Sequence, residues 1–194
     1  LCNNYLEAAE QAGIPFNEDY NTGEMEGAAI YQITTRKGFR ASASRAYFHP
    51  IKNRSNIDLS LRSQVTRVLF EGKKANGVEF IKNGKLEQVK AHCEVIICGG
   101  AINSPQVLQN SGIGSSALLS KFDIPVIHHS PNVGENLQDH MGASIYYQSK
   151  VPTLNQSLGS LWGKLNVGID YILRRKGPLS LSVNQGGGFV KAQN

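Results

Sequence analysis

The chain has few of the residues that would mark a disulfide-stabilised or zinc-binding protein. Its 194 residues include three cysteines, Cys2, Cys93 and Cys98. An odd number of cysteines at these spacings fits neither a disulfide framework nor a set of zinc ligands. Buried thiols are the simpler interpretation for Cys93 and Cys98, because both lie in or beside an apolar segment. The sequence therefore favours a reducing cytoplasm as the compartment.

Long apolar runs and runs of like charge are also missing. No apolar stretch approaches the roughly 20 residues that a helix needs to cross a bilayer, so we expect no membrane span. The formal net charge is +5, but the basic residues are spread along the chain and form no basic tail. We therefore expect no nucleic-acid partner, and we leave association with a membrane surface open.

Motifs for metal-dependent or hydrolytic chemistry are absent as well. None of the five histidines has the spacing of a metal site, and the neighbours His128 and His129 would point to opposite faces of a strand. Ser111 lacks the upstream glycine of a nucleophile elbow. The glycines 186–188 lack the Lys-Ser/Thr that completes a phosphate loop, so a flexible turn into a strand is preferred. We predict no metal ligand in this chain.

The first and last parts of the chain contain both helical and strand patterns. Residues 1–12 have helical spacing. Residues 28–35 have the β-branched and aromatic composition of a strand, and residues 39–42 are expected to pair back on it. Towards the end of the chain, we predict a strand at residues 145–147 and an amphipathic helix at residues 157–175 with one apolar face.

The segment around Pro50 is predicted to be a boundary. Residues 44–47 are compatible with a brief helix that Pro50 ends. The clash between a proline ring and the residue before it also biases His49 towards an extended conformation.

From residue 57 the pattern changes to short strands separated by turns, which is typical of an antiparallel meander. Asn83-Gly84 is a strong hairpin turn, because both residues tolerate positive φ. The last strand, Glu94 to Cys98, is continuously apolar, as in a sheet interior covered on both faces. The preceding strands are predicted at residues 58–63, 65–70, 75–81 and 86–91.

The most informative stretch runs from Val95 to Gly114. An apolar strand is followed by Gly99-Gly100, and Ser104-Pro105 is a good start for a helix. Strand, glycine turn and helix is the geometry by which α/β proteins bring their backbone close to a nucleotide. By itself, however, a double glycine is explained more simply as a tight turn.

The longer string is more specific, and it resembles the second signature of the glucose-methanol-choline (GMC) oxidoreductases, in the choline-dehydrogenase-like branch. The segment Asn132 to His140 is similar to the family's VGENLQDH segment, and Val65 to Phe80 is similar to the strand pair before the signature. The resemblance spans nearly the whole chain. The matching signature positions are Gly100, Ala101, Ser104, Pro105, Val107, Leu108, Ser111, Gly112, Ile113 and Gly114.

The resemblance implies that the protein binds FAD. It places a backbone contact to the adenine on Val65, and it places the turn formed by Cys98, Gly99, Gly100 and Ala101 near the nucleotide. A polar network of Asn136, Gln138, Asp139 and His140 would order the adjoining loop.

The resemblance also implies a mixed α/β and α+β fold. Residues 57–142 would be part of an FAD/NAD(P)-binding-type domain with a β-meander. Residues 1–56 and 143–194 would be parts of an antiparallel-sheet substrate (cap) domain.

Two features of the family are missing from the sequence: the G-x-G-x-x-G fingerprint and the C-terminal His with a second His or Asn. The chain also begins at Leu1 without Met and ends at Asn194 without an evident terminal helix. We therefore expect a central fragment of a longer protein, with the remainder of that protein as its partner, and we assign no catalytic residue here.

The function that the resemblance implies is hydride transfer from the CH–OH group of a small alcohol to FAD. The substrate and the electron acceptor are not specified by the residues present. Two alternatives stay open: a non-redox lyase on the same scaffold, similar to hydroxynitrile lyases, and a non-catalytic binding domain.

Overall fold

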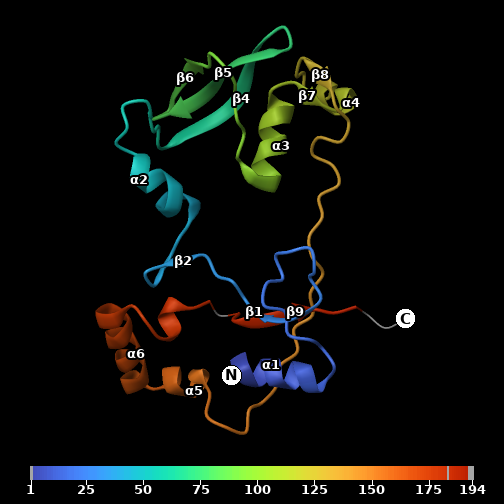
Figure 1. Ribbon diagram of the computed structural model, residues 1–194. Helices are drawn as coiled ribbons and strands as arrows, with labels where there is room; N and C mark the ends of the chain where they lie inside the picture. Colours follow the sequence, from blue (N-terminus) through green and yellow to red (C-terminus); the bar gives the residue numbers. More distant parts are fainter. Residues whose placement is uncertain (1, 183, 192–194) are drawn as a thin grey trace. The chain divides into compact units, whose positions relative to one another are not determined.

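The computed structural model describes residues 2–182 and 184–191 (Figure 1). The chain divides into two compact units, one formed by residues 1–57 and 146–194 and the other by residues 58–145. Helices and antiparallel strand pairs occur in the chain, which confirms the predicted mixed fold class. The assignment of these units to FAD-binding and substrate domains stays a prediction.

The first unit is built around a two-stranded antiparallel sheet. Strand β1 (Gly27–Ile30) pairs with β9 (Gly186–Phe189), and helix α1 (Cys2–Gln11) packs against β1 (Figure 1). A Cβ on Gly188 would collide with the backbone of Gly27. The glycines 186–188, expected to form a flexible turn, are therefore part of the strand, because a larger residue could not approach β1 so closely.

The short elements that follow confirm part of one prediction and correct two others. Strands β2 (Thr35–Arg36) and β3 (Phe39–Arg40) form the predicted hairpin, but the strand predicted at residues 28–35 is interrupted at residues 31–34. The helical turn η1 (Ser44–Phe48) continues directly into α2 (His49–Ile51), so Pro50 does not end the helix. His49 is helical and not extended, because its amide donates to the Ser44 carbonyl and Pro50 occupies the first turn of α2, where no N–H is required.

The predicted C-terminal helix is divided in two. Helix α5 (Leu154–Gly159) ends before Ser160, whose hydroxyl accepts a hydrogen bond from Gly163 N at 2.9 Å and caps α6 (Leu161–Arg174). A further short turn, η2 (Pro178–Ser180), follows. Within the described part of the chain, the large apolar residues of α6 are exposed, with Trp162 at 77%.

The second unit contains the predicted meander. Strands β4 (Ser63–Glu71), β5 (Lys74–Lys82) and β6 (Lys85–Lys90) pair in that order, and Asn83 and Gly84 form the β5–β6 turn with φ of 51° and 76°. The expected strand at residues 58–63 is wrong except for its last residue. Glu79 ties the three strands together, because it accepts hydrogen bonds from Arg67 and Gln88.

Helix α3 (Gly100–Asn110) lies beside this meander, with β7 (Ile113–Gly114), α4 (Ser116–Ser120) and β8 (His128–His129) beyond its C-terminal end (Figure 1). Strands β7 and β8 pair in parallel.

Two predicted strands are not formed. Residues 94–98 form no strand and have no ladder partner in the described chain, and residues 145–147 are irregular. A strand of a sheet interior requires neighbours on both sides, which the described residues do not supply for residues 94–98. As a consequence, Cys93 and Cys98 are exposed free thiols and not buried ones.

Candidate functional site

The turn before α3 is the most open part of the candidate site. Cys98, Gly99, Gly100 and Ala101 are contiguous and exposed. Gly100 has φ of 80°, and a Cβ placed on it would meet no atom within 4 Å. The first amides of a helix have no intrahelical acceptor, so this end of α3 offers N–H donors to a ligand.

The helix begins earlier than Ser104-Pro105, which corrects the predicted start. The Ser104 hydroxyl accepts a hydrogen bond from Gly99 N at 3.0 Å, and Pro105 lies inside the helix. Ser104 therefore satisfies a backbone donor in front of the helix instead of capping a helix that starts at residue 105.

Val65 lies on β4, the strand against which α3 packs. It is half-buried, pairs with Phe80, and precedes an irregularity in the ladder between Val65 and Arg67. The hydrogen bond that joins strand and helix is three residues further along: Val68 N donates to Ser111 Oγ at 2.8 Å. The structure thus links the two elements that carry the predicted cofactor residues, through Ser111 and not through Val65 itself.

Ser111 is a buried polar residue at the C-terminal end of α3. Its hydroxyl accepts from Val68 N and donates to the Val107 carbonyl, so both of its hydrogen-bonding functions are used. The next residue, Gly112, has φ of 85°, and its carbonyl accepts from Ile127 N at 2.8 Å. A Cβ at Gly112 would collide with the Pro125 carbonyl oxygen, so only glycine fits.

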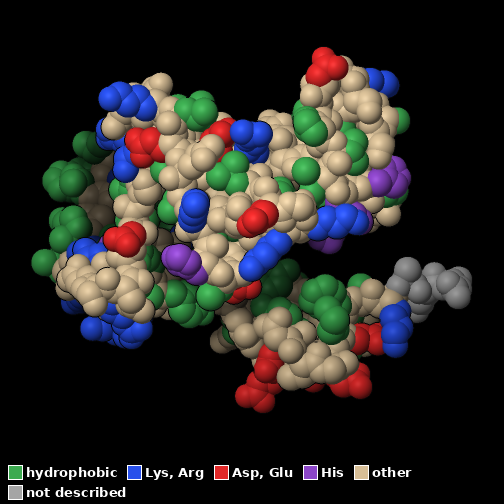
Figure 2. Space-filling model, turned by 90° about the horizontal axis from the view of Figure 1, so that it is seen from above, with side chains coloured by type: hydrophobic (Ala, Val, Ile, Leu, Met, Phe, Trp, Pro, Cys, Tyr) green, Lys and Arg blue, Asp and Glu red, His purple; other side chains and the backbone are tan. Residues whose placement is uncertain are grey.

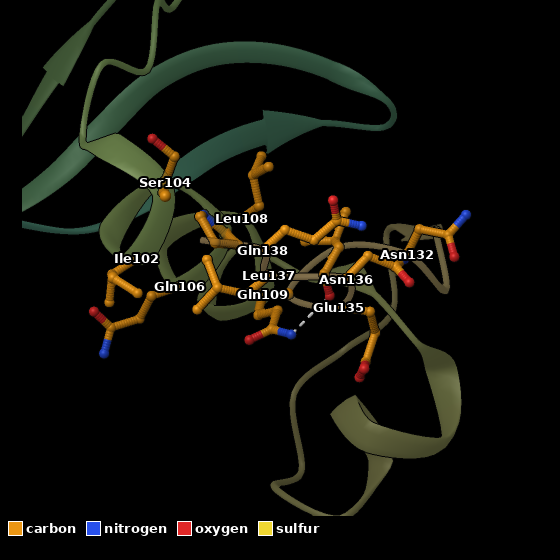
Figure 3. A pocket seen from close by; sticks show the side chains of 14 residues that line it. Ile102, Ser104, Gln106, Leu108, Gln109, Asn132, Glu135, Asn136, Leu137 and Gln138 are labelled. Carbon is orange, nitrogen blue, oxygen red and sulfur yellow. Dashed lines mark hydrogen bonds between the residues drawn. The ribbon is translucent and has the colours of Figure 1, made fainter. Parts of the chain in front are cut away.

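A groove of about 870 Å³ runs between α3 and the segment 132–138 (Figure 3). The residues that line it include Ala101, which connects the groove with the open turn. Most polar lining side chains are uncharged amides, and Glu135 is the one charged residue among those that line the groove. The amides are Gln106, Gln109, Asn132, Asn136 and Gln138.

The segment 132–138 is held to α3 by Gln109. Its Nε2 donates to the Val133 carbonyl oxygen at 2.9 Å, the hydrogen bond drawn in Figure 3. The predicted network of Asn136, Gln138, Asp139 and His140 is not formed: the side-chain hydrogen bond within this stretch runs from His140 N to Asp139 Oδ1 at 2.8 Å. These side chains are exposed, so water satisfies their polar groups and nothing compels them to pair.

A bidentate ion pair joins β4 and β5 of the meander. Glu79 is 6% exposed and receives two hydrogen bonds from the Arg67 guanidinium, both at 3.0 Å. Arg67, followed by Gln88, lowers the pKa of the Glu79 carboxyl from its ordinary 4.5 to about 2. Such a bidentate pair fixes the register of the strands, because both groups are planar and must align.

Several kinds of site are not found in residues 2–182 and 184–191. No helix there is both long and apolar enough to cross a bilayer, and no group of His, Cys, Asp and Glu is placed to hold a metal ion. On the face seen in Figure 2, Lys and Arg side chains are interspersed with acidic, hydrophobic and uncharged groups.

Comparison with known proteins identifies the family. A family model described as GMC oxidoreductase matches residues 1–142. The chain belongs to the GMC oxidoreductase family. Human mitochondrial choline dehydrogenase is 41% identical to this GMC chain over 189 residues, and oxygen-dependent choline dehydrogenase of Chromohalobacter salexigens is 37% identical over 195 residues.

These matches cover nearly all of this chain but a minor part of each relative. The alignments cover 97% and 100% of the chain, but 32% and 35% of the human and bacterial proteins. A solved FAD-dependent oxidoreductase from Chaetomium thermophilum matches with a TM-score of 0.80 at 26% identity, over 95% of this chain and 33% of that one. The chain thus spans about a third of the length of its relatives.

The sequence did not indicate Gln109, the residue that joins the two walls of the groove. Ser111, Gly112 and Gly134 lie in the segments that carry the family resemblance, whereas Gln109 does not stand out in the sequence. A polar residue near the end of a helix is usually solvated, and no spacing rule indicates that its partner is a carbonyl 24 residues further along.

Proposed function

We propose that this chain contributes part of the cofactor-binding region of an FAD-dependent oxidoreductase that acts on the CH–OH group of a small alcohol. Family membership supports the proposal, as do relatives named choline dehydrogenase and FAD-dependent oxidoreductase. The structural observation that carries it is the open glycine turn at Gly100, where a Cβ would meet no atom within 4 Å and residues 98–101 are exposed.

The residues of the turn fit a flat, anionic ligand. We propose that Cys98, Gly99, Gly100 and Ala101 contact FAD through their backbone, with Val65 contributing from β4. Bound FAD would supply the acceptor for a hydride from the alcohol carbon. The chain's own residues would bind and orient that group, and we assign the role of proton acceptor to none of them.

The wider assignments follow from the same family relationship. We propose that residues 57–142 belong to the FAD-binding domain and that residues 1–56 and 143–194 belong to the substrate domain. A cytoplasmic location stays a prediction, which fractionation of cells would test. The electron acceptor is left open, and oxygen is the one that the name of the bacterial relative specifies.

The full-length protein provides the test. Purified protein should show flavin absorbance, and anaerobic addition of choline or a small primary alcohol should bleach it, because the flavin is then reduced. Reoxidation by oxygen or by a quinone-like dye would identify the class of acceptor. Bound flavin that no alcohol reduces, together with cleavage of a cyanohydrin, would favour the lyase. Protein without flavin would contradict the proposal.

A further inference from the structure

One side-chain hydrogen bond sets the position of the groove wall opposite α3. Gln109 is the penultimate residue of α3 and is half-buried. Its Nε2 lies 2.9 Å from the Val133 carbonyl oxygen. Among the described residues, this is the one side-chain hydrogen bond between α3 and the segment 132–138. The segment contains no helix or strand of its own. Its backbone hydrogen bonds, from Val133 N to Ser130 O and from Glu135 N to Asn132 O, are local turns, so they do not tie it to α3.

Two glycines from different segments leave room for this one side chain. Gly134 has φ of 86°, and a Cβ on it would collide with the Gln109 amide nitrogen and lie 3.2 Å from the amide carbon. On β7, a Cβ at Gly114 would lie 3.3 Å from Gln109 Cγ. The Gln109 side chain is therefore enclosed by backbone at both its stem and its amide.

The chemistry of this contact requires a donor at position 109. The Val133 carbonyl can only accept, and a glutamine amide donates to it without introducing charge. Methionine has nearly the same length but no N–H, and ionised glutamate presents an acceptor to an acceptor. Glu135 is the one carboxylate that lines the groove, so a negative charge at position 109 would also lie in a groove that already contains one.

We propose that Gln109 is a positioning residue of the cofactor site, which holds the segment 132–138 against α3 and so fixes one wall of the groove next to the FAD turn. The inference rests on the proposed function, because the groove connects with that turn through Ala101. Gln109 acts through the Val133 carbonyl and needs no contact with FAD.

The test compares Gln109→Met and Gln109→Glu in the full-length holoprotein. Loss of one neutral hydrogen bond should increase the rate of FAD release about three- to ten-fold, measured as recovery of free-flavin fluorescence. The matched controls are Gln11→Met and Gln11→Glu, at an exposed position of α1 whose side chain makes no hydrogen bond within the described chain. They should release FAD at the wild-type rate.

A pH profile separates positioning from a general loss of structure. A protonated glutamate can donate to the Val133 carbonyl, so the excess FAD release of Gln109→Glu over wild type should shrink as the pH falls from about 6 to about 4. Gln109→Met should show a constant excess. Repeating the profile in a Glu135→Gln background removes the other carboxylate of the groove. A pH-independent excess for Gln109→Glu would contradict the proposal.

Gly134→Ala supplies a second and independent route to the same contact. Its Cβ should displace the Gln109 amide, so combining it with Gln109→Met should cost little more than either change alone. Gly84→Ala controls for positive φ without crowding. Fully additive effects, or wild-type FAD release in both Gln109 variants, would overturn the inference. A wild-type protein without FAD would instead overturn the proposed function.

Discussion

A glycine lies near each end of α3, but the surroundings of the two glycines differ. Gly100 and Gly112 have nearly the same backbone angle, with φ of 80° and 85°. A Cβ at Gly100 would meet nothing within 4 Å, whereas one at Gly112 would collide with the Pro125 carbonyl and lie 2.9 Å from Ile127 Cγ1. Gly100 therefore lies beside open space, whereas Gly112 lets two parts of the chain pack closely together.

From this difference we predict that substitutions at the crowded end lower the free energy of unfolding, and that substitutions at the open end lower the affinity for FAD. The largest loss of stability is expected for Gly112→Ala. An alanine at positive φ costs about 1–2 kcal/mol, and overpacking against an immobile carbonyl adds about 1–3 kcal/mol. Urea unfolding of the full-length protein should show a loss of about 3 kcal/mol. A loss no larger than that of Gly84→Ala, where φ is positive but the space is free, would show that the crowding is unimportant.

The next largest effect is expected for Ser111→Ala, also at the crowded end. The change leaves the Val68 amide without its acceptor, and an unsatisfied buried donor costs about 1–3 kcal/mol. Ser120→Ala is the matched control, because Ser120 is exposed on α4 and surface changes stay within about 0.5 kcal/mol. Equal unfolding midpoints for the two variants would show that the Ser111 hydroxyl does not help to anchor α3 to β4.

A smaller change in stability, but a larger one in binding, is expected for Gly100→Ala at the open end. Its stability should fall by about 1–2 kcal/mol, as for Gly84→Ala, because both positions combine positive φ with free space. FAD affinity should fall only in Gly100→Ala, by about ten-fold, measured by flavin titration of the apoprotein. If both alanine variants bind FAD like the wild type, the open turn is not the contact.

A loss of stability confined to acidic pH is expected from the Glu79–Arg67 pair, which joins β4 and β5. The Glu79 pKa is lowered from 4.5 to about 2 in the folded protein. Its contribution to stability is therefore complete above pH 4.5 and declines as the pH falls from 4.5 towards about 2. Urea midpoints measured across this range should fall more steeply for the wild type than for Glu79→Gln. Parallel curves would assign the acid sensitivity to other groups.

The meander was predictable because its signals are local. Asn83-Gly84 requires positive φ at both residues and adopts it, with φ of 51° and 76°. The strands on either side pair as expected in the order β4, β5, β6. A tight turn between two alternating segments leaves them few other partners, so sequence pattern and structure agree here.

The segment 94–98 shows where local signals stop. Its apolar residues predict an interior strand, yet it has no partner in the described chain, and Ile96 is 72% exposed. An apolar composition indicates that a segment could be buried inside a sheet, but it does not indicate whether a neighbouring strand is present. The prediction of where α3 begins was wrong for a related reason. The Ser104 hydroxyl accepts a hydrogen bond from Gly99 N, five residues earlier, and does not mark the first turn of the helix.

The sequence by itself determined the family, through the string from Gly100 to Gly114 and the segment 132–140, together with the meander and the glycine turn. Backbone angles and signature residues are properties of neighbours in the chain, so they can be inferred from its order. Only the tertiary structure decided which glycine is open and which is enclosed, and that Gln109 holds Val133. Those outcomes depend on the space around a side chain, which segments far apart in the sequence create when they pack together.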